Sequence, residues 1–321
     1  MKNRRGVLKK MPLFLNTNMP KSTLMFLTLL VSLVPIVYYT EWLTFDVQLL
    51  ISGVAISLFG IPHGAIDHII FQKKNEVKSS DFYFYYLGLM LAYLILWLVF
   101  PRISMLAFML LSAFHFGQSQ FYTYTIQNKI LKSFVYFSWG TALLSSLIIF
   151  NTAEILDIAK QNPDLSIFIS ETSIYLYCLI FIVSIFSFLA LSIFLVIFKT
   201  LLMKAIVKET LMLSLILVNF YCLPLLLGFT VYFCTLHSMQ VLSDEFDFLK
   251  EKLKGFSTFY FIKLLFPYSI ISVLGILFLM GMSLLKIFPI SATLLVFIVV
   301  SILTLPHSIV MDNFYSKKKE H

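Results

Sequence analysis

The chain has 321 residues, of which 60% are hydrophobic and only 12% are charged, and its mean hydropathy is +0.92. Soluble domains carry about 25% charged residues, so this composition excludes an ordinary water-soluble protein and predicts a polytopic membrane protein. The formal net charge of +8 does not indicate nucleic-acid binding, because the cations lie in short segments between apolar runs. The three cysteines form neither a disulfide framework nor a CxxC metal site.

Long apolar stretches predict the fold class. A transmembrane helix needs about 20 mostly apolar residues to cross a bilayer. Windows of that length predict an all-α, polytopic transmembrane helical bundle of about ten spans. The seventh and eighth are short and meet near Pro224, so they form either a tight hairpin or one broken segment. In chain order the predicted spans cover residues 22–40, 47–71, 82–100, 103–122, 133–150, 173–198, 209–224, 226–242, 262–284 and 289–314.

Lysine and arginine are unevenly distributed over the segments that connect these spans. If the spans alternate in direction and the N-terminus lies inside, 21 of these residues are cytoplasmic and only 3 are external. Cytoplasmic loops carry such an excess, so both termini are predicted to be cytoplasmic. The expected organisation is a basic cytoplasmic segment at 1–21, a single transmembrane helical domain at 22–314 and a basic cytoplasmic tail at 315–321. The expected location is the cell membrane, which the chain crosses several times.

Five of the six histidines lie inside apolar segments, where ionisable groups are costly and indicate a functional site. His63, His115, His237 and His307 lie on four even-numbered spans that run in the same direction. Each lies 5–8 residues from the cytoplasmic end of its span, so the four share one layer about 8–12 Å deep. A shared layer predicts one metal site with these four ligands. The alternative is that each histidine hydrogen-bonds across a helix pair. His68 follows His63 by five residues and faces another direction, so it is expected at the interface.

Carboxylates near these histidines are candidates to orient them. Asp67 follows His63 by four residues, on the same helix face, and metal-bound histidines commonly donate their second N–H to a carboxylate. Asp312 either has the same role or is an exposed residue at a helix end. An all-imidazole set suits Fe, Cu, Zn or Ni, and two histidines also suffice for a haem. The 34 Phe and 16 Tyr suit a long apolar or polyene ligand, although aromatic residues are also normal in apolar cores.

Four motifs around these histidines resemble those of the Brp/Blh family of membrane-integral β-carotene 15,15′-dioxygenases. Here they read GIPHGAIDH, FHFGQSQ, LHSMQ and LPHSIVMD. In the family they read approximately GLPHGALD, HFGxxD, HSxxH and VPHxxxxD, in the same order and at comparable separations. The resemblance covers nearly the whole chain. It implies a non-haem Fe(II) enzyme that uses O2 to split the central double bond of β-carotene into two retinal molecules, which would supply a microbial rhodopsin.

The resemblance implies that His63, His115 and His237 are iron ligands, and no catalytic residue beyond the metal ligands is expected. The chain departs from the family pattern at two positions, where Val241 replaces the second His of HSxxH and Gln120 replaces the Asp of HFGxxD. His307 lies at a suitable depth to complete the site. Two alternatives therefore stay open: a carotenoid- or retinal-binding membrane protein without turnover, and a bis-His haem protein.

Overall fold

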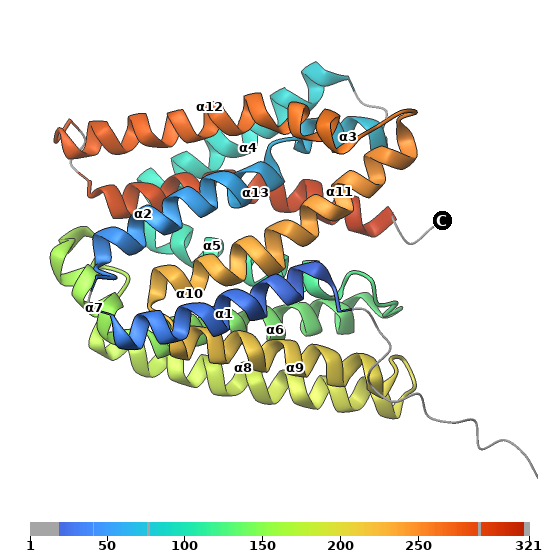
Figure 1. The fold of residues 1–321 in the computed structure, drawn as a ribbon, viewed down its shortest axis with the longest axis horizontal. Helices are drawn as coiled ribbons and strands as arrows, with labels where there is room; N and C mark the ends of the chain where they lie inside the picture. Colours follow the sequence, from blue (N-terminus) through green and yellow to red (C-terminus); the bar gives the residue numbers. More distant parts are fainter. Residues whose placement is uncertain (1–18, 41, 76–77, 288–289, 318–321) are drawn as a thin grey trace, which may run out of the picture.

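The computed structural model describes residues 19–40, 42–75, 78–287 and 290–317. Within these residues the fold is an all-α bundle without strands, and most of its helices run along one common direction (Figure 1). The prediction of an all-α polytopic bundle is therefore confirmed. Residues 1–18 of the predicted N-terminal segment and 318–321 of the predicted tail lie outside the described residues.

The elements include short π-helical (η1, η4) and 3₁₀-helical (η2, η3) turns between the α-helices. In chain order they are α1 (Lys21–Tyr39), α2 (Phe45–Ala55), η1 (Ile56–Gly60), η2 (Ile61–Gly64), α3 (Asp67–Asn75), α4 (Ser79–Val99), α5 (Pro101–Phe121), α6 (Lys129–Phe150), α7 (Thr152–Gln161), η3 (Pro163–Leu165), α8 (Glu171–Ile197), α9 (Met203–Cys222), α10 (Leu225–Tyr232), η4 (Phe233–Ser238), α11 (Met239–Lys252), α12 (Thr258–Leu284) and α13 (Ala292–Lys317).

Nine helical rods in the described part of the chain are long and apolar enough to cross a membrane, so the chain is a multi-pass membrane protein. Two of them are composite: Phe45–Asn75 joins α2, η1, η2 and α3, and Leu225–Lys252 joins α10, η4 and α11. The sequence also predicted a span at α5. This helix has the length of a span, but its histidine, glutamines and serines make it less apolar than the nine. It packs among α4, α6 and α13.

Several helices begin after a residue whose side chain caps the helix. The Asn128 side chain accepts hydrogen bonds from the first backbone N–H groups of α6, and the Ser257 side chain does the same for α12. Ser170 and Ser173 form a reciprocal capping box at the start of α8. Pro101 opens α5, where a missing backbone N–H has no cost. Side-chain oxygens at these positions satisfy N–H groups that have no partner within the helix.

The predicted seventh and eighth spans form a tight hairpin, because only Leu223 and Pro224 separate α9 from α10. The rod Leu225–Lys252, which corresponds to the predicted eighth span, continues ten residues beyond the end expected at 242. Val241, Glu245 and Leu249, spaced four residues apart, are fully buried on one face, so packing against the bundle continues where the sequence becomes polar.

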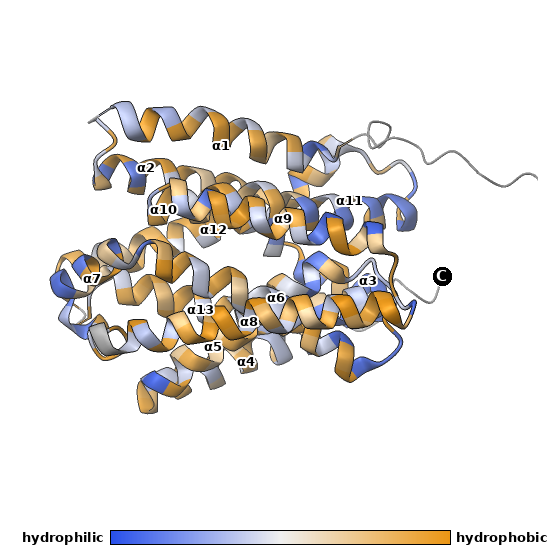
Figure 2. Ribbon diagram, turned by 90° about the horizontal axis from the view of Figure 1, so that it is seen from below, coloured by the Kyte–Doolittle hydropathy of each residue, from blue (hydrophilic) through white to orange (hydrophobic). Residues whose placement is uncertain are grey.

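Both described ends of the chain lie at the same end of the bundle, which we call the terminus end (Figures 1 and 2). At the opposite end lies α7. Carboxylates of α7 and of η3, which follows it, accept hydrogen bonds from the turns of two helix hairpins. The Glu154 carboxylate accepts a hydrogen bond from the backbone N–H of Leu225, at 2.8 Å, where α10 begins. Asp164 accepts one from the backbone N–H of Ser291, at 2.7 Å, just before α13. The assignment of the terminus end to the cytoplasm stays a prediction.

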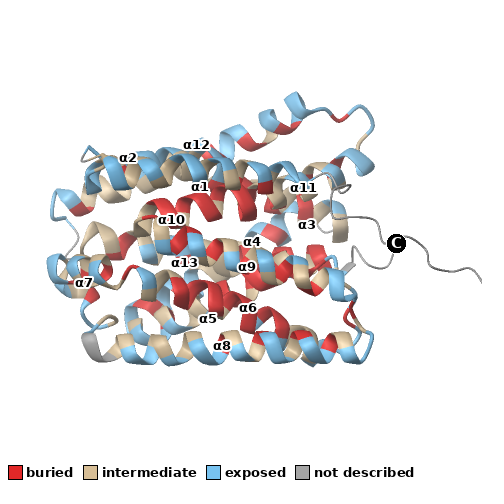
Figure 3. Cartoon of the chain, turned by 60° about the horizontal axis from the view of Figure 1, so that its bottom comes forward, coloured by how far each residue is buried: buried red, intermediate tan, exposed pale blue. Residues whose placement is uncertain are grey.

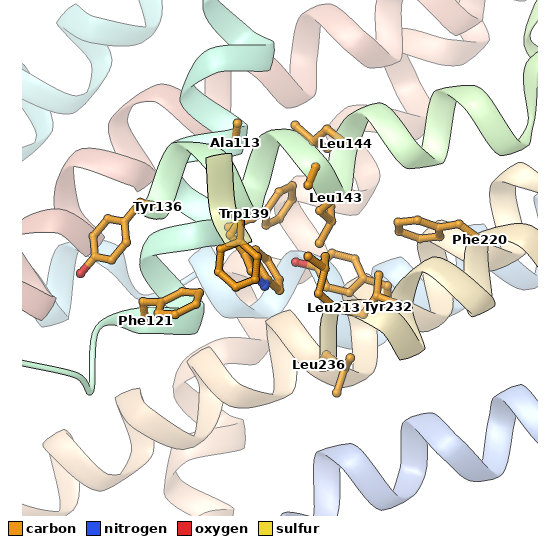
Figure 4. Close-up of a cluster of buried hydrophobic side chains, with 14 of the residues drawn as sticks. Ala113, Phe121, Tyr136, Trp139, Leu143, Leu144, Leu213, Phe220, Tyr232 and Leu236 are labelled. Atoms are coloured by element: carbon orange, nitrogen blue, oxygen red, sulfur yellow. The ribbon is translucent and has the colours of Figure 1, made fainter. Parts of the chain in front are cut away.

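The core lies where α5 and α6 touch backbone to backbone. A Cβ atom added to Gly117 would lie 2.0 Å from the carbonyl oxygen of Tyr136, and one added to Gly140 would lie 1.8 Å from that of Ala113. Only glycine permits this approach. Buried residues concentrate on the inner helices, whereas α8 and α12 are largely exposed (Figure 3). The packed side chains at the centre include Phe121, Trp139, Leu143, Leu213, Phe220 and Tyr232 (Figure 4).

Candidate metal centre

Four histidines from four separate rods meet inside the bundle. His63 lies in η2, His115 in α5, His237 in η4 and His307 in α13. Their rings form a closed cycle in the order His63, His237, His115, His307, with neighbouring ring centroids 4.8–5.3 Å apart. All four side chains are buried, with exposed fractions of 3–9%. Imidazoles bound to one ion at about 2.0–2.1 Å have centroids about 4.5–5.3 Å apart when the bond angles are about 90–110°. The ring spacing therefore fits four imidazoles around one ion.

Two of these rings have their Nδ1 atoms held by acceptors outside the cycle. His63 Nδ1 donates to the backbone carbonyl of Gly60. His307 Nδ1 donates to both carboxylate oxygens of Asp67, each at 3.0 Å. Both acceptors accept only, so Nδ1 carries the proton in each ring. In a neutral imidazole, the lone pair then lies on Nε2.

The same tautomer follows for His237. Its Nδ1 lies 3.1 Å from the Ser119 hydroxyl oxygen, and that hydroxyl donates its own proton to the carbonyl of Phe116. Ser119 therefore accepts from His237 Nδ1, and the lone pair again lies on Nε2. Ser119 was not among the predicted site residues, although it follows His115 by four residues, one helical turn.

The remaining nitrogens of the cycle lack partners. Nε2 of His237, Nε2 of His307 and both nitrogens of His115 are buried and have no hydrogen-bond partner among the described residues. Each unsatisfied buried polar atom costs about 1–3 kcal/mol. Within the described ranges, no group of three or more His, Cys, Asp or Glu side chains is arranged, as it stands, to hold a metal ion. The donor set and its unsatisfied nitrogens have the chemistry to bind a metal, and the rings would have to move to do so.

Irregular helical turns place two of the histidines. His63 follows the π-turn η1, and His237 lies within the π-turn η4. A Cβ atom added to Gly60 would lie 2.9 Å from the ring of Phe233, and one added to Gly64 would lie 3.3 Å from Nδ1 of His307. These glycines let η1 and η2 approach their neighbours closely. π-turns occur frequently at functional sites because they reorient side chains locally.

An aromatic wall, made by Phe116, Tyr232 and Phe233, covers one side of the cycle. Phe233 stacks on His237 with ring centroids 5.4 Å apart, and Phe116 meets the same imidazole edge to face at 4.9 Å. Tyr232 packs against Phe116 at 5.7 Å. Such a surface is apolar and excludes water from the imidazoles.

The carboxylates near the cycle have different partners from those expected. Asp67 binds His307 rather than His63, because 3₁₀ and turn geometry between residues 61 and 66 breaks the helical phase that would align Asp67 with His63. Tyr86 also donates to Asp67, at 3.1 Å. Asp312 is exposed and accepts a hydrogen bond from Gln118 at 2.6 Å. The structure therefore favours the second interpretation of Asp312, that of an exposed residue.

His68 lies apart from the four clustered histidines. It is partly buried among aromatic rings of α4 and α12, with its centroid 4.5 Å from that of Tyr268 and 5.8 Å from that of Tyr83. It belongs to the outer surface of its rod, as its five-residue offset from His63 predicts.

The two positions that depart from the family pattern both lie outside the cycle. Val241 is fully buried in an apolar cluster with Ile66 and Met311. Gln120 donates to the buried carboxylate of Glu209 on α9. An aspartate at position 120 would have brought a second acceptor to Glu209 instead of a donor, so glutamine matches this neighbour.

The turn after α5 is fixed by two tyrosines. Tyr122 donates to Asp244 at 2.5 Å, and Tyr124 donates to Glu209 at 2.6 Å. Burial, and then the adjacent carboxylate, raise the pKa of each tyrosine above its ordinary value. Both hydroxyls therefore stay protonated donors at physiological pH, and they tie the end of α5 to α11 and α9.

Comparison with known proteins identifies the family of this chain. No curated protein and no solved structure matches the chain. The family model described as Beta-carotene 15,15′-dioxygenase matches residues 54–315, a range that contains all four clustered histidines and most of the helical bundle. The chain therefore belongs to the β-carotene 15,15′-dioxygenase family.

Proposed function

We propose that this protein is a β-carotene 15,15′-dioxygenase that holds one Fe(II) ion between His63, His115, His237 and His307. The observation that carries the proposal is the closed cycle of buried imidazoles whose remaining nitrogens have no protein partner. Family membership supports a carotenoid as the substrate. An imidazole set suits Fe among the metals that activate O2.

An iron ion bound here would activate O2, so that the 15,15′ C=C bond and the O=O bond break and two C=O bonds form. Each oxygen atom ends in one retinal aldehyde, and no further reductant is required. The chain's part is to hold the four rings. Asp67, Ser119 and the Gly60 carbonyl fix three imidazoles in the tautomer that offers Nε2 to the ion.

The aromatic wall has two tasks in this proposal. It keeps water away from the imidazoles, and it offers flat apolar surface to a polyene that enters from the bilayer. A hydrocarbon carries no polar group for a hydrogen bond to select, so the position of cleavage depends on the shape of the surrounding protein. Retinal is released into the cell membrane, where a microbial rhodopsin is the expected acceptor.

Two alternatives predict other behaviour. A carotenoid-binding protein without turnover would use the same bundle, and the departures at Val241 and Gln120 are its support. A bis-His haem protein needs space for a macrocycle between two axial ligands. The four imidazoles meet edge to face at 4.8–5.3 Å, which leaves no such space between neighbouring rings.

Expression in bacteria that accumulate β-carotene tests the proposal. The intact chain should bleach the cells and produce retinal, measured by chromatography. Changing any one of the four clustered histidines to alanine should abolish retinal while the protein still reaches the membrane. His68→Ala is the matched control, because His68 lies in the same rod as His63 but outside the cycle, and it should retain full activity.

Each competing outcome has its own signature. Purified protein that holds iron and carotenoid but releases no aldehyde under O2 would select the binding protein. A Soret band would select the haem protein. Undiminished retinal from His115→Ala or His307→Ala would refute the assignment of the ligands.

A further inference from the structure

The buried carboxylates of the described residues lie on one side of the histidine cycle. Among the described residues the buried carboxylates are Asp67, Glu209 and Glu245, and each lies between the cycle and the terminus end. The rods that carry the histidines also have buried polar side chains on the α7 side. The hydroxyls of Ser104, Thr235 and Ser301 donate hydrogen bonds to backbone carbonyls of their own helices. The hydroxyls of Ser52 and Thr230, also on the α7 side, are buried without a partner but are neutral. Among the described residues, a cation would therefore find buried carboxylates only on the terminus side.

Glu245 has no partner in the described structure. It is fully buried, and neither of its carboxylate oxygens has a hydrogen bond. It lies between Val241 and Leu249 on the face of α11 that packs against α3 and α13, and it interacts electrostatically with Asp67 and Asp244. A buried carboxylate without side-chain partners is commonly satisfied by a bound water molecule or ion.

Tyr315 on α13 is a second, independent unpartnered group. Its side chain is 3% exposed, its hydroxyl has no hydrogen-bond partner among the described residues, and it interacts electrostatically with Glu245. Glu245 follows His237 by eight residues, and Tyr315 follows His307 by eight. Both therefore lie about 12 Å beyond the histidines toward the terminus end.

Asp67 occupies the level between these groups and the cycle. It follows His63 by four residues, about 6 Å along the rod, and it is bonded to His307. Tyr315 and Glu245, then Asp67, then His307 thus form a series of oxygen ligands that ends at the imidazoles. Carboxylate and hydroxyl oxygens bind divalent cations, and imidazoles bind Fe(II) in preference, so each step can pass an ion inward.

We propose that Tyr315, Glu245 and Asp67 line the route by which a divalent cation passes from the terminus end to the four histidines. The inference rests on the proposed metal centre. Glu245 replaces part of the hydration shell of the ion while it crosses the apolar cluster around Val241 and Leu249. Fixed negative charge in a low-dielectric passage raises the rate of ion entry by about 10- to 1,000-fold.

The rate of cobalt uptake tests this route. Metal-free protein is mixed with Co(II), and the visible absorption of histidine-bound Co(II) is followed over time. Glu245→Gln keeps the shape of the side chain and removes its charge, so uptake should be about ten-fold slower with the same final cobalt content. Glu245→Asp should take up cobalt close to the wild-type rate. Asp247→Asn, an exposed change on the same helix, is the control and should have no effect.

A second variant covers the case in which Glu245→Gln does not fold. Tyr315→Phe keeps the ring that stacks on Tyr122 and removes only the hydroxyl, so it should also slow uptake. Uptake by Glu245→Gln at the wild-type rate would overturn the route, as would a lower final cobalt content at an unchanged rate. Wild-type protein that binds no Co(II) would refute the metal centre itself.

Discussion

Replacing Asp67 by asparagine tests whether the polar groups around the cycle support metal binding. Asp67 is 3% exposed and accepts one bifurcated hydrogen bond from His307 Nδ1, with both oxygens at 3.0 Å, and one of 3.1 Å from Tyr86. Asparagine has nearly the same size and can still accept from Nδ1, but it carries no negative charge. The substitution therefore removes the charge and leaves the packing in place.

The size of the effect follows from this single hydrogen-bonded pair. A buried hydrogen bond to a charged group contributes about 1.5–3 kcal/mol, and a neutral one contributes about 0.5–1.5 kcal/mol. The difference of about 1–1.5 kcal/mol corresponds to a factor of about 5–15 in affinity. Changes to residues that orient metal-bound histidines weaken binding about 10- to 100-fold. The two ranges overlap near ten-fold, which is the loss we expect for Asp67→Asn.

Competition with a chelator of known affinity measures this loss on purified protein. Tyr86→Phe is the matched comparison, because it removes one neutral donor to the same carboxylate and should weaken metal binding less than Asp67→Asn does. Wild-type affinity in Asp67→Asn would refute the reasoning that this carboxylate supports His307 as a ligand. Equal losses in both variants would indicate that the carboxylate acts through its position rather than its charge.

Three further predictions concern the bundle. Gly117→Ala places a Cβ atom 2.0 Å from the α6 backbone and should lower the free energy of unfolding by about 3 kcal/mol or more, measured as a lower unfolding temperature in detergent. Gly88→Ala is the control and should not lower it, because nothing lies within 4 Å of the added Cβ atom. Gln120→Asp should cost about 1–3 kcal/mol, and adding Glu209→Gln should recover most of it by exchanging donor and acceptor. Glu154→Gln should cost about 0.3–1 kcal/mol and leave metal affinity unchanged, because it weakens only the start of α10.

Hydropathy predicted the nine rods that are apolar enough to cross a membrane and a tenth span at α5, which is less apolar, but not where each helix ends. A hydropathy window has the length of a helix that crosses the bilayer, and the predicted span ends where charged residues begin. In the rod that ends with α11 the helix continues past this point to Lys252, because Val241, Glu245 and Leu249 keep one face buried against α3 and α13. The end of that helix depends on tertiary contacts that no local window contains.

The layer of the four histidines could be predicted because the rise per residue along a helix is nearly constant, whatever the neighbours. Rotation about the helix axis is less constant. The π- and 3₁₀-turns of η1 and η2 separate Asp67 from the face of His63 and bring it to His307. The supporting contacts from Ser119 and the Gly60 carbonyl depend on how rods pack and on a backbone group, and neither leaves a pattern in the sequence.

The two departures from the family pattern lie where they leave the cycle intact. Val241 follows His237 by one turn toward the terminus end, so a histidine there would lie near the level of Asp67 rather than among the four rings. The ring of His307 instead stands between those of His63 and His115 and closes the cycle. Gln120 is bonded away from the cycle, to Glu209. The cycle of four imidazoles is therefore complete without a histidine at position 241, which favours the proposed metal centre over a family member that has lost it.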